Sequence, residues 1–431
     1  MQRVDAERAR ELSLFRPLGY QKNSCGYCKS RDGSASYYVR SDSVLPGHYE
    51  ELINGGWRRS GNLYYRQNLL RSCCPHYTLR LEASTYRPRR DQRKAINKWN
   101  KFILGPEYMR KVARLCPQTR EEKKHRKCNF DLLSAVHQSE YGHIKRPIDP
   151  ATKNPIEPAH RFEVTIEGDS VSQAKFELFR KYQTAIHKDD FSELTPRAFQ
   201  SFLCSGIKRS PNPLTATNAS EKKLGSWHQC YRLDGELIAV AVLDLTPNGV
   251  SSVYVFYDPA YEQWEIGKLS AMREIAFSIE NQYQYYYMGY YIHSCQKCDT
   301  RPISAPNPES GDWDPLAGEL TEKLNSRSYV SLSRDRRSSP EPVVPEIDGD
   351  EEEVSLFDMG MPGILTASQV EALDLGHWLL SFDNGFVHMN NLVDWETMSM
   401  TEPMSIKRII AELAAVLGPK IVQNSAVDLI G

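Results

Sequence analysis

The chain lacks any apolar run of the length that crosses a lipid bilayer, which is about 18 residues or more. Its opening stretch, MQRVDAERARELSLFRPLGY, contains no continuous apolar segment, so we expect no secretory signal peptide. A surplus of one charge sign is also missing, because 54 Lys and Arg residues are matched by 55 Asp and Glu residues. We therefore expect a protein of the cytosol, and also of the nucleus, with no membrane partner.

Internal repeats are missing as well, and the 10 cysteines are not accompanied by a secretion signal. Cysteines in a reducing compartment predict free thiols and a metal site rather than a disulfide framework. The 431 residues suffice for two or three domains of about 100–200 residues each. A hydrophobic content of 40% allows these domains a sizeable core.

Charge is balanced overall but unevenly distributed. Tyr86–Lys127 holds 15 Lys and Arg residues against 4 Asp and Glu residues, whereas Ser338–Asp358 holds 8 acidic residues and no basic one. The basic segment either binds a polyanion such as RNA or forms a solvated helical face, and both interpretations stay open. The residues that we expect to contact RNA phosphates are Arg89, Arg90, Arg93 and Lys94.

Four of the cysteines have the spacing of metal ligands. Cys25 and Cys28 are separated by two residues, and Cys73 and Cys74 are adjacent. Four thiolates satisfy a zinc ion or an iron–sulfur cluster, and the sequence leaves this choice open. His76 is a spare ligand, and the alternative is that all four cysteines are buried, inert thiols.

The segment from Cys230 to Cys295 carries the most regular pattern of the chain. Leu237–Leu245 and Val253–Tyr257 have the composition of strands, and Asn248-Gly249 between them is a hairpin signal. A helix begins near Gly267, and an aromatic strand follows it. Strand, hairpin, strand, helix and strand is the order of acetyltransferase-type folds, so we expect an α+β fold with an acetyltransferase-like mixed sheet.

Periodicity and capping residues predict the remaining elements. The predicted helices are Asp91–Lys111, Ser172–His187, Thr195–Gly206 and Ser405–Leu417, and the predicted strands are Leu63–Tyr65, Tyr77–Leu81 and Arg161–Glu167, with a hairpin around Asn384-Gly385. We expect five segments: a cysteine/metal domain (1–90), a basic helical segment and linker (91–160), an acetyltransferase-like domain (161–333), a disordered acidic linker (334–362) and a C-terminal segment that closes that domain (363–431).

The N-terminal part contains three motifs in this order: Cys25-Gly26-Tyr27-Cys28, Gly56-Trp57-Arg58-Arg59-Ser60-Gly61 and Cys73-Cys74-Pro75. These motifs and the block from Cys230 to Cys295 closely resemble the arginyl-tRNA–protein transferases of the fungal type, which have the motifs in the same order. The resemblance extends over about Ser24–Lys297 and resumes more weakly at WDPLAGELTEKLNSRSYVSLSR. It implies transfer of arginine from arginyl-tRNA to proteins that begin with Asp, Glu or oxidised Cys, which marks them for the ubiquitin machinery. It also implies a metal or iron–sulfur centre at the four cysteines.

The resemblance implies which residues recognise the acidic N-terminus. Arg58 and Arg59 match the family's arginine pair, in what reads as a Gly-flanked loop. Arginine suits this role because its guanidinium binds a carboxylate through two hydrogen bonds. Arg80 is the next candidate, and the alternative for the pair is an exposed basic turn.

Further residues are candidates for catalysis and for binding the acceptor end of the tRNA. Asp258, Glu274 and His293 are available to take the proton of the attacking amine, although an Asp before Pro usually forms a turn. Tyr287, Tyr290 and Tyr291 either stack on the terminal adenine or pack in a core. We select Asp258 and His293 as the catalytic candidates, and we expect Arg273 to pair with Glu274 or Asp258.

The chain departs from the family after Lys297. A tract rich in Pro and Ser lies between Cys298 and Trp313, where the family has a further strand. Cys298 stands where the family has Met, so Cys295 and Cys298 are interpreted as free thiols. We expect a sheet without this strand and a weak transferase, unless Tyr329–Ser333 closes the sheet instead.

Two other functions compete with arginine transfer. A coenzyme-A-dependent N-acetyltransferase would need a Gly-rich pyrophosphate turn, and Gln263–Leu269 offers only Gly267. A non-catalytic, metal-containing RNA-binding protein would account for the basic segment and the cysteines. It would leave the block from Cys230 to Cys295 unexplained.

Overall fold

The computed structural model describes residues 12–121, 130–209, 222–293, 303–340, 354–382 and 385–429. The chain divides into two compact units. The first unit contains residues 1–81, 205–225 and 287–431, and the second contains residues 82–204 and 226–286. Across these described stretches, no helix is both long and apolar enough to span a membrane.

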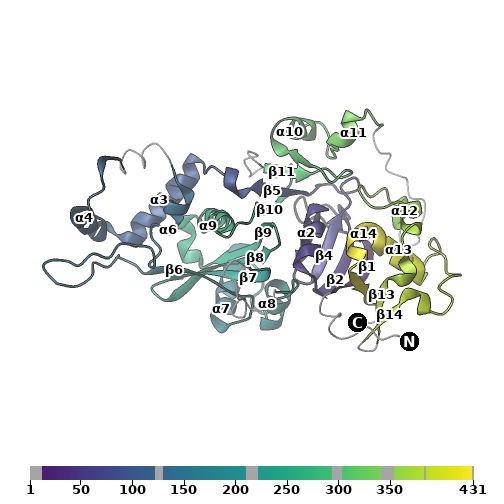
Figure 1. Ribbon diagram of the computed structural model, residues 1–431, viewed down its shortest axis with the longest axis horizontal. Helices are drawn as coiled ribbons and strands as arrows, with labels where there is room; N and C mark the ends of the chain where they lie inside the picture. Colours follow the sequence, from purple (N-terminus) through teal and green to yellow (C-terminus); the bar gives the residue numbers. More distant parts are fainter. Residues whose placement is uncertain are drawn as a thin grey trace. The chain divides into compact units, whose positions relative to one another are not determined.

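A seven-stranded mixed sheet belongs to the first unit, with the strand order β14-β13-β15-β1-β2-β4-β3 (Figure 1). The strands are β1 Ser13–Asn23, β2 Ser34–Ser43, β3 Trp57–Ser60, β4 Leu63–Gln67, β13 Leu379–Phe382, β14 Gly385–His388 and β15 Ser425–Val427. Strand β15 pairs in parallel with both β1 and β13, while β1 pairs with β2 in antiparallel. The two ends of the chain therefore build one sheet.

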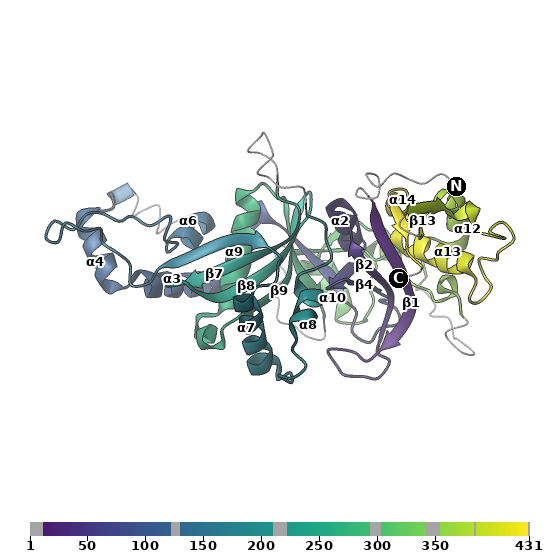
Figure 2. The same ribbon diagram turned by 90° about the horizontal axis from the view of Figure 1, so that it is seen from below.

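Helix α13 (Ile406–Leu417) packs against β1 in this unit, as Figure 2 shows. Its buried residues include Ile410, Leu413 and Val416, which recur at helical spacing. The predictions of this helix and of the hairpin before it are confirmed, because β13 and β14 pair in antiparallel. Short helices α12 (Ala367–Glu371) and α14 (Pro419–Val422) both contact α13.

Strand β3 replaces the loop that we expected around Arg58 and Arg59. Helix α2 (Pro46–Asn54) ends at Gly55 and is followed by Gly56 at φ +85°, a conformation that glycine adopts without strain. The chain then enters β3, which pairs in antiparallel with β4 from Trp57 to Ser60. The expectation of a loop was wrong because flanking glycines mark the ends of a short strand as well as those of a turn.

The first unit also contains the strand neighbours β12-β11-β5-β10. Their bounds are β5 Tyr77–Glu82, β10 Tyr285–Tyr291, β11 Ile303–Pro306 and β12 Trp313–Pro315, and the chain passes between the two units within β10. Strand β11 pairs in antiparallel with both β5 and β12. The expectation that the Pro- and Ser-rich tract lacks a strand was therefore wrong. Tyr329–Ser333 does not close the sheet, because no strand forms there.

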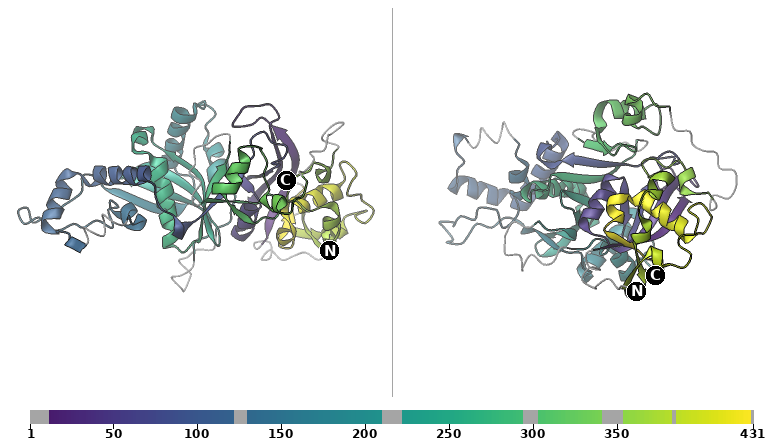
Figure 3. Two further views of the ribbon diagram at one scale, coloured as in Figure 1. Left: turned by 90° about the horizontal axis from the view of Figure 1, so that it is seen from above. Right: turned by 45° about the vertical axis from the view of Figure 1, so that its right-hand side comes forward.

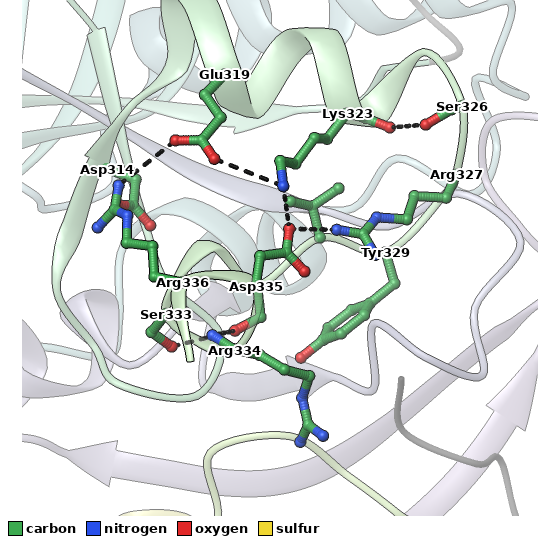
Figure 4. Close-up of polar contacts among 12 residues, drawn as sticks. Asp314, Glu319, Lys323, Ser326, Arg327, Tyr329, Ser333, Arg334, Asp335 and Arg336 are labelled. Carbon is green, nitrogen blue, oxygen red and sulfur yellow. Dashed lines mark hydrogen bonds and ion pairs between the residues drawn. The ribbon is translucent and has the colours of Figure 1, made fainter. Parts of the chain in front are cut away.

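Two short helices, α10 (Thr321–Leu324) and α11 (Leu332–Arg336), follow β12 and are joined by ion pairs (Figure 4). Asp335 accepts hydrogen bonds from Lys323, at 2.7 Å, and from Arg327. Arg336 lies 3.4 Å from Asp314, the middle residue of β12. These contacts fix the segment that follows the departure from the family pattern.

The second unit contains the strand neighbours β9-β8-β7-β6 and confirms the predicted strand, hairpin, strand and helix order. The elements are β6 Phe162–Gly168, β7 Gly225–Leu233, β8 Glu236–Leu245, β9 Gly249–Tyr257, α7 Gln173–Tyr182, α8 Pro196–Leu203 and α9 Ile266–Glu280. Helices α7 and α8 cover one face, where Phe179 and Phe199 pack against Val240 and Val242. Helix α9 lies over the other face (Figures 1 and 3).

Before β6, the second unit includes the helices α3 (Arg90–Leu104), α4 (Pro106–Leu115) and α6 (Leu132–His137). The expected single helix Asp91–Lys111 is divided at Gly105, which has φ +74°, and at Pro106. Proline at the first turn of a helix starts a new helix without losing a hydrogen bond. Helix α7 is likewise shorter than expected, because Gln183–His187 forms a π-helical turn.

Candidate functional site

The four cysteines predicted as metal ligands lie together in the first unit. Cys25 and Cys28 follow the end of β1, and Cys73 and Cys74 lie between β4 and β5. Their sulfur atoms all lie within 4.8 Å of one another, and the Sγ atoms of Cys28 and Cys73 are 3.2 Å apart. Tetrahedral zinc with Zn–S bonds of about 2.3 Å needs sulfur atoms about 3.8 Å apart. The geometry thus fits one metal centre.

The backbone around the cysteines is shaped to bring the sulfur atoms together. The amide of Cys25 donates to the carbonyl of Ser30 at 2.9 Å, which closes the turn that carries Cys28. A Cβ atom at Gly33 would lie 2.7 Å from the Sγ of Cys73. Only glycine therefore allows this close approach.

The surroundings of Cys28 and Cys73 shift the pKa values of their thiols in opposite directions. Hydrogen bonds from the Ser30 backbone and from Cys73 lower the pKa of Cys28 to about 6. Burial and the nearby Cys28 raise the pKa of Cys73 to about 12. Several thiolates crowded together repel one another, and a bound cation removes this penalty because metal ligands must be deprotonated. The donor set therefore suits a metal that prefers sulfur.

A cluster of three aromatic rings lies beside the cysteines. The ring of His76 is 5.1 Å from that of Tyr27 and 4.8 Å from that of Tyr290, and Tyr290 packs against Cys25 and Cys74. Burial lowers the pKa of His76 to about 4, so the ring is neutral at pH 7. Tyr290 is thus packed beside the cysteines, as one of the two sequence interpretations expected.

Arg58 and Arg59 extend from β3 into the interior of the first unit, and each is only 6% exposed. Arg58 donates to the carbonyl of Gly289 at 2.9 Å, and Arg59 donates to those of Gly61 and Ser205 at 3.0 and 2.9 Å. Both side chains therefore hold backbone segments together, and the exposed-turn alternative was wrong. Their role in substrate binding stays a prediction.

The other predicted residues of the first unit also have defined partners. The guanidinium of Arg80 lies 3.6 Å from the ring centre of Trp313, as a cation–π pair. His293 interacts through Nδ1 with the hydroxyl of Tyr291 at 2.7 Å and through Nε2 with Asn325 at 3.1 Å. The ring of His293 is thereby oriented. Cys295 and Cys298 lie outside the described residues.

Asp258, the other catalytic candidate, belongs to the second unit. It caps the short helix Pro259–Trp264 by accepting from the amide of Ala260 at 2.9 Å, and Lys181 donates to it at 2.6 Å. This is the turn-forming role that the sequence held as an alternative. Its role as a base stays a prediction.

Helix α9 carries two buried polar networks that the sequence did not reveal. Arg273 pairs with Glu140 at 2.8 Å and Glu280 at 3.1 Å, so the expected pairing with Glu274 or Asp258 was wrong. Glu274 instead accepts hydrogen bonds from Ser270 at 2.5 Å and Tyr286 at 2.8 Å. Burial raises the pKa of Glu274.

The four residues predicted to contact RNA lie at the start of α3 in the second unit. Arg89, Arg90, Arg93 and Lys94 are all exposed. Arg89 lies 3.5 Å from Asp91, the acidic residue in the first turn of the helix. The arrangement gives the helix N-terminus a cluster of exposed cations.

A pocket of about 440 Å³ lies within the first unit, and sequence patterns did not predict it. Its walls come from α2, β4, β5, the β11–β12 loop and the region around α13. Arg66, His76 and Thr78 are among its polar residues. No sequence motif joins these segments, so only the fold brings them together.

Two parts of the chain match family models. Residues 23–94 match "Arginine-tRNA-protein transferase, N terminus", and residues 174–299 match "Arginine-tRNA-protein transferase, C terminus". The chain is 32% identical to arginyl-tRNA–protein transferase 1 of Saccharomyces cerevisiae, over 58% of this chain and 46% of the yeast protein. It thus spans about half the length of that relative. It is 25% identical to the Drosophila melanogaster protein of the same name, over 75% of this chain and 86% of the relative.

Among solved structures, the C-terminal domain of a lysylphosphatidylglycerol synthetase from Agrobacterium fabrum aligns with 67% of this chain and 74% of its own length. Its sequence identity is 10% and its TM-score is 0.26, which does not establish a common fold. The acetyltransferase-like assignment of the second unit therefore stays a prediction.

Proposed function

Because this chain belongs to the arginine-tRNA–protein transferase family, we propose that it transfers arginine from arginyl-tRNA to the α-amino group of proteins that begin with Asp, Glu or oxidised Cys. The observation that carries this proposal is the pair of family matches, at residues 23–94 and 174–299. The first contains the four clustered cysteines, and the second contains β8, β9, α9 and β10.

The proposed reaction needs an unprotonated amine and a positioned ester. The amine nitrogen attacks the ester carbonyl carbon of arginyl-tRNA, and the bond from that carbon to the ribose oxygen breaks. The proton that the amine loses passes to a base and then to the departing ribose oxygen. Both catalytic candidates already have partners: Tyr291 and Asn325 contact the two ring nitrogens of His293, and Lys181 and a helix cap occupy Asp258, so either residue must exchange a partner before it takes the proton.

We further propose that Cys25, Cys28, Cys73 and Cys74 hold one metal centre, either zinc or an iron–sulfur cluster. The compact set of sulfur atoms supports this proposal. The centre would tie the end of β1 to the segment before β5 and so stabilise the first unit. Cellular roles belong to the same proposal: action in the cytosol and nucleus, and delivery of arginylated proteins to the ubiquitin machinery.

A reconstituted transfer assay tests the proposed function. Purified protein, tRNA, arginyl-tRNA synthetase, labelled arginine and a peptide that begins with Asp should give labelled peptide. Ribonuclease treatment of the charged tRNA, or use of an N-acetylated peptide, should abolish the label. No transfer to Asp or Glu peptides by folded protein with its metal bound would contradict the proposal.

A further inference from the structure

The pocket of the first unit is bounded by segments that are distant in sequence. Its lining residues include Glu51 of α2, Arg66 of β4, Thr78 of β5 and Glu309 of the β11–β12 loop. Its volume of about 440 Å³ is within the usual range for small-ligand sites. None of the residues that sequence reasoning assigned to substrate binding lines it.

Arg66 gives the pocket a cation without an acidic partner. Its Nη2 donates to the carbonyls of Pro362 and Gly363 at 3.1 and 3.0 Å. Within the described ranges, no carboxylate forms an ion pair with it. Burial lowers the pKa of Arg66 to about 10, so the guanidinium is charged at pH 7. A half-buried charge held only by neutral carbonyls favours an anionic ligand.

Thr78 adds an independent sign of a ligand. This residue is 1% exposed and lines the pocket, and its Oγ1 has no hydrogen-bond partner in the part of the chain that the structure describes. The two ring nitrogens of His76, which also lines the pocket, lack partners there too. Buried polar atoms without partners are costly, so three such atoms on residues that line one pocket point to a polar ligand there.

The β11–β12 loop, which carries Glu309, is held in place by several side-chain hydrogen bonds. Asn307 donates to Asp314 at 2.9 Å, and its Oδ1 accepts from the hydroxyls of Ser331 and Ser333 at 3.0 and 2.9 Å. Glu309 itself accepts from the hydroxyl of Tyr329 at 2.9 Å. A wall with this many hydrogen bonds presents the Glu309 carboxylate in one position, which reduces the entropy lost on binding.

The charges around the pocket favour a small zwitterion over a polyanion. Two acidic residues, Glu51 and Glu309, line the pocket together with the single cation Arg66. Glu51 pairs with Lys420 at 3.1 Å and Glu309 with Arg334 at 2.5 Å, which holds both carboxylates in place. Lys420 and Arg334 neutralise these carboxylates in part, so their remaining oxygen lone pairs can accept from an ammonium group, whereas a chain of phosphates would find only Arg66 as a cation among the residues that line the pocket. A protein N-terminus with an acidic first residue carries both an α-ammonium and a side-chain carboxylate.

We propose that this pocket binds the acidic first residue of the acceptor protein, with Arg66 receiving the side-chain carboxylate and Thr78 supplying a further hydrogen bond. The inference rests on the proposed function, because it assigns a substrate of that reaction. Arg66 thereby becomes a specificity-determining residue that sequence motifs did not indicate. Glu51 and Glu309 face the α-ammonium before it loses its proton.

Peptide binding in the absence of tRNA tests this inference separately from transfer. The dissociation constants of two peptides that differ only in beginning with Asp or Asn are measured by fluorescence anisotropy. Wild-type protein should prefer the Asp peptide by about tenfold or more, the ratio expected for one hydrogen bond to a charged group. Arg66→Gln should remove this preference and leave Asn-peptide affinity within about twofold. Arg66→Lys should retain part of it.

Arg40→Gln is the matched control, because Arg40 is an exposed cation on β2 of the same unit. It should leave both dissociation constants unchanged. Thr78→Val should raise the thermal midpoint, since it removes a buried hydroxyl without a partner, yet weaken Asp-peptide binding several-fold. A purely structural role would move stability and binding in the same direction. If Arg66→Gln fails to fold, Thr78→Val still tests the proposal.

Three results would overturn the inference. The first is an equal loss of Asp- and Asn-peptide affinity in Arg66→Gln, and the second is no loss of either. The third is reduced tRNA affinity with an intact preference for Asp, which would assign the pocket to RNA. Peptide preference without any arginine transfer would support the pocket while contradicting the proposed reaction, so the two failures are distinguishable.

Discussion

At the scale of single residues, the first unit holds buried arginines with hydrogen bonds to backbone carbonyls. Arg58, Arg59 and Arg66 each donate to main-chain oxygens. Such a guanidinium orders the backbone around it, because its fixed fork of donors joins two or more segments. A neutral carbonyl does not neutralise the positive charge of the guanidinium. Because Arg66 lines a pocket, its charge is available there to an anionic ligand.

In the second unit, His137 is held by charged carboxylates rather than by neutral backbone carbonyls. The protonated ring donates to Glu140, 2.7 Å away, and to Glu280, 2.6 Å away, while Arg273 pairs with both carboxylates. His143 lies 3.3 Å from Glu140. These groups join α6 to α9. Hydrogen bonds to Glu140 and Glu280 raise the pKa of His137 to about 9.

This network predicts a stability that falls at alkaline pH. A raised folded-state pKa means that the contribution of His137 is complete below its unfolded pKa of about 6.5 and is lost as pH rises through about 9. The difference in unfolding free energy between wild type and His137→Gln should therefore be larger at about pH 6 than at about pH 9.5. Urea unfolding at several pH values measures it. Glu280→Gln, which removes one acceptor, should reduce the same pH dependence, and a constant difference would contradict this role of His137.

Some of these functional residues could be predicted from the sequence, and others could not. The spacing within the pairs Cys25/Cys28 and Cys73/Cys74 indicated metal ligands, because spacing within a pair is a local property. That the two pairs share one site followed from the family resemblance, since Cys28 and Cys73 are 45 residues apart. Arg66 and Thr78 could not be recognised, since their significance depends on walls contributed by distant segments. The pairing of Arg273 was missed for the same reason: Glu140 is remote in sequence.

At the scale of elements, helix α3 combines a buried apolar side with an exposed basic cluster at its start. Its buried residues, which include Ile96, Trp99 and Ile103, pack inside the second unit. Its first turns expose the basic cluster of Arg89, Arg90, Arg93 and Lys94. An amphipathic helix of this kind can present cations to RNA without disturbing the core.

Neutralising that cluster should weaken tRNA binding and flatten its salt dependence. For each phosphate that the protein no longer neutralises, the slope of log affinity against log salt should fall by about 0.7–0.9. Replacement of all four residues by Gln tests this in a filter-binding titration at several salt concentrations. The matched control replaces four exposed basic residues of the same unit: Lys145, Lys153, Lys188 and Arg197. Equal effects of the two sets would mean that α3 is not the RNA-binding element.

Elements that depend on residues close together in sequence were predicted well, and a strand that depends on pairing with distant segments was not. Helix α13 and the β8–β9 hairpin follow from residues close together in sequence. Strand β11 was missed because Ile303–Pro306 contains Pro and Ser, yet it is stabilised by partners on both sides. Because this strand is present, the reason for expecting weak transfer no longer holds.

At the scale of the whole molecule, the metal centre is expected to determine the integrity of the first unit. Purified protein should contain about one zinc per chain, or else iron and sulfide with visible absorption. Chelation should lower the thermal midpoint and make Cys25 and Cys28 reactive toward thiol reagents. Cys116→Ser, outside the cluster, is the control and should retain the metal. Metal-free protein of unchanged stability would contradict a structural role for the centre.

The position at which arginine is attached tests the proposed transfer better than any other measurement. A peptide that begins with Asp, incubated with the protein and arginyl-tRNA, is examined by tandem mass spectrometry. We expect a gain of one arginine residue at the α-amine of Asp, no gain for the N-acetylated peptide, and no gain when arginyl-tRNA is replaced by free arginine. An unchanged peptide mass, or arginine attached at a side chain, would contradict arginine transfer to the N-terminus.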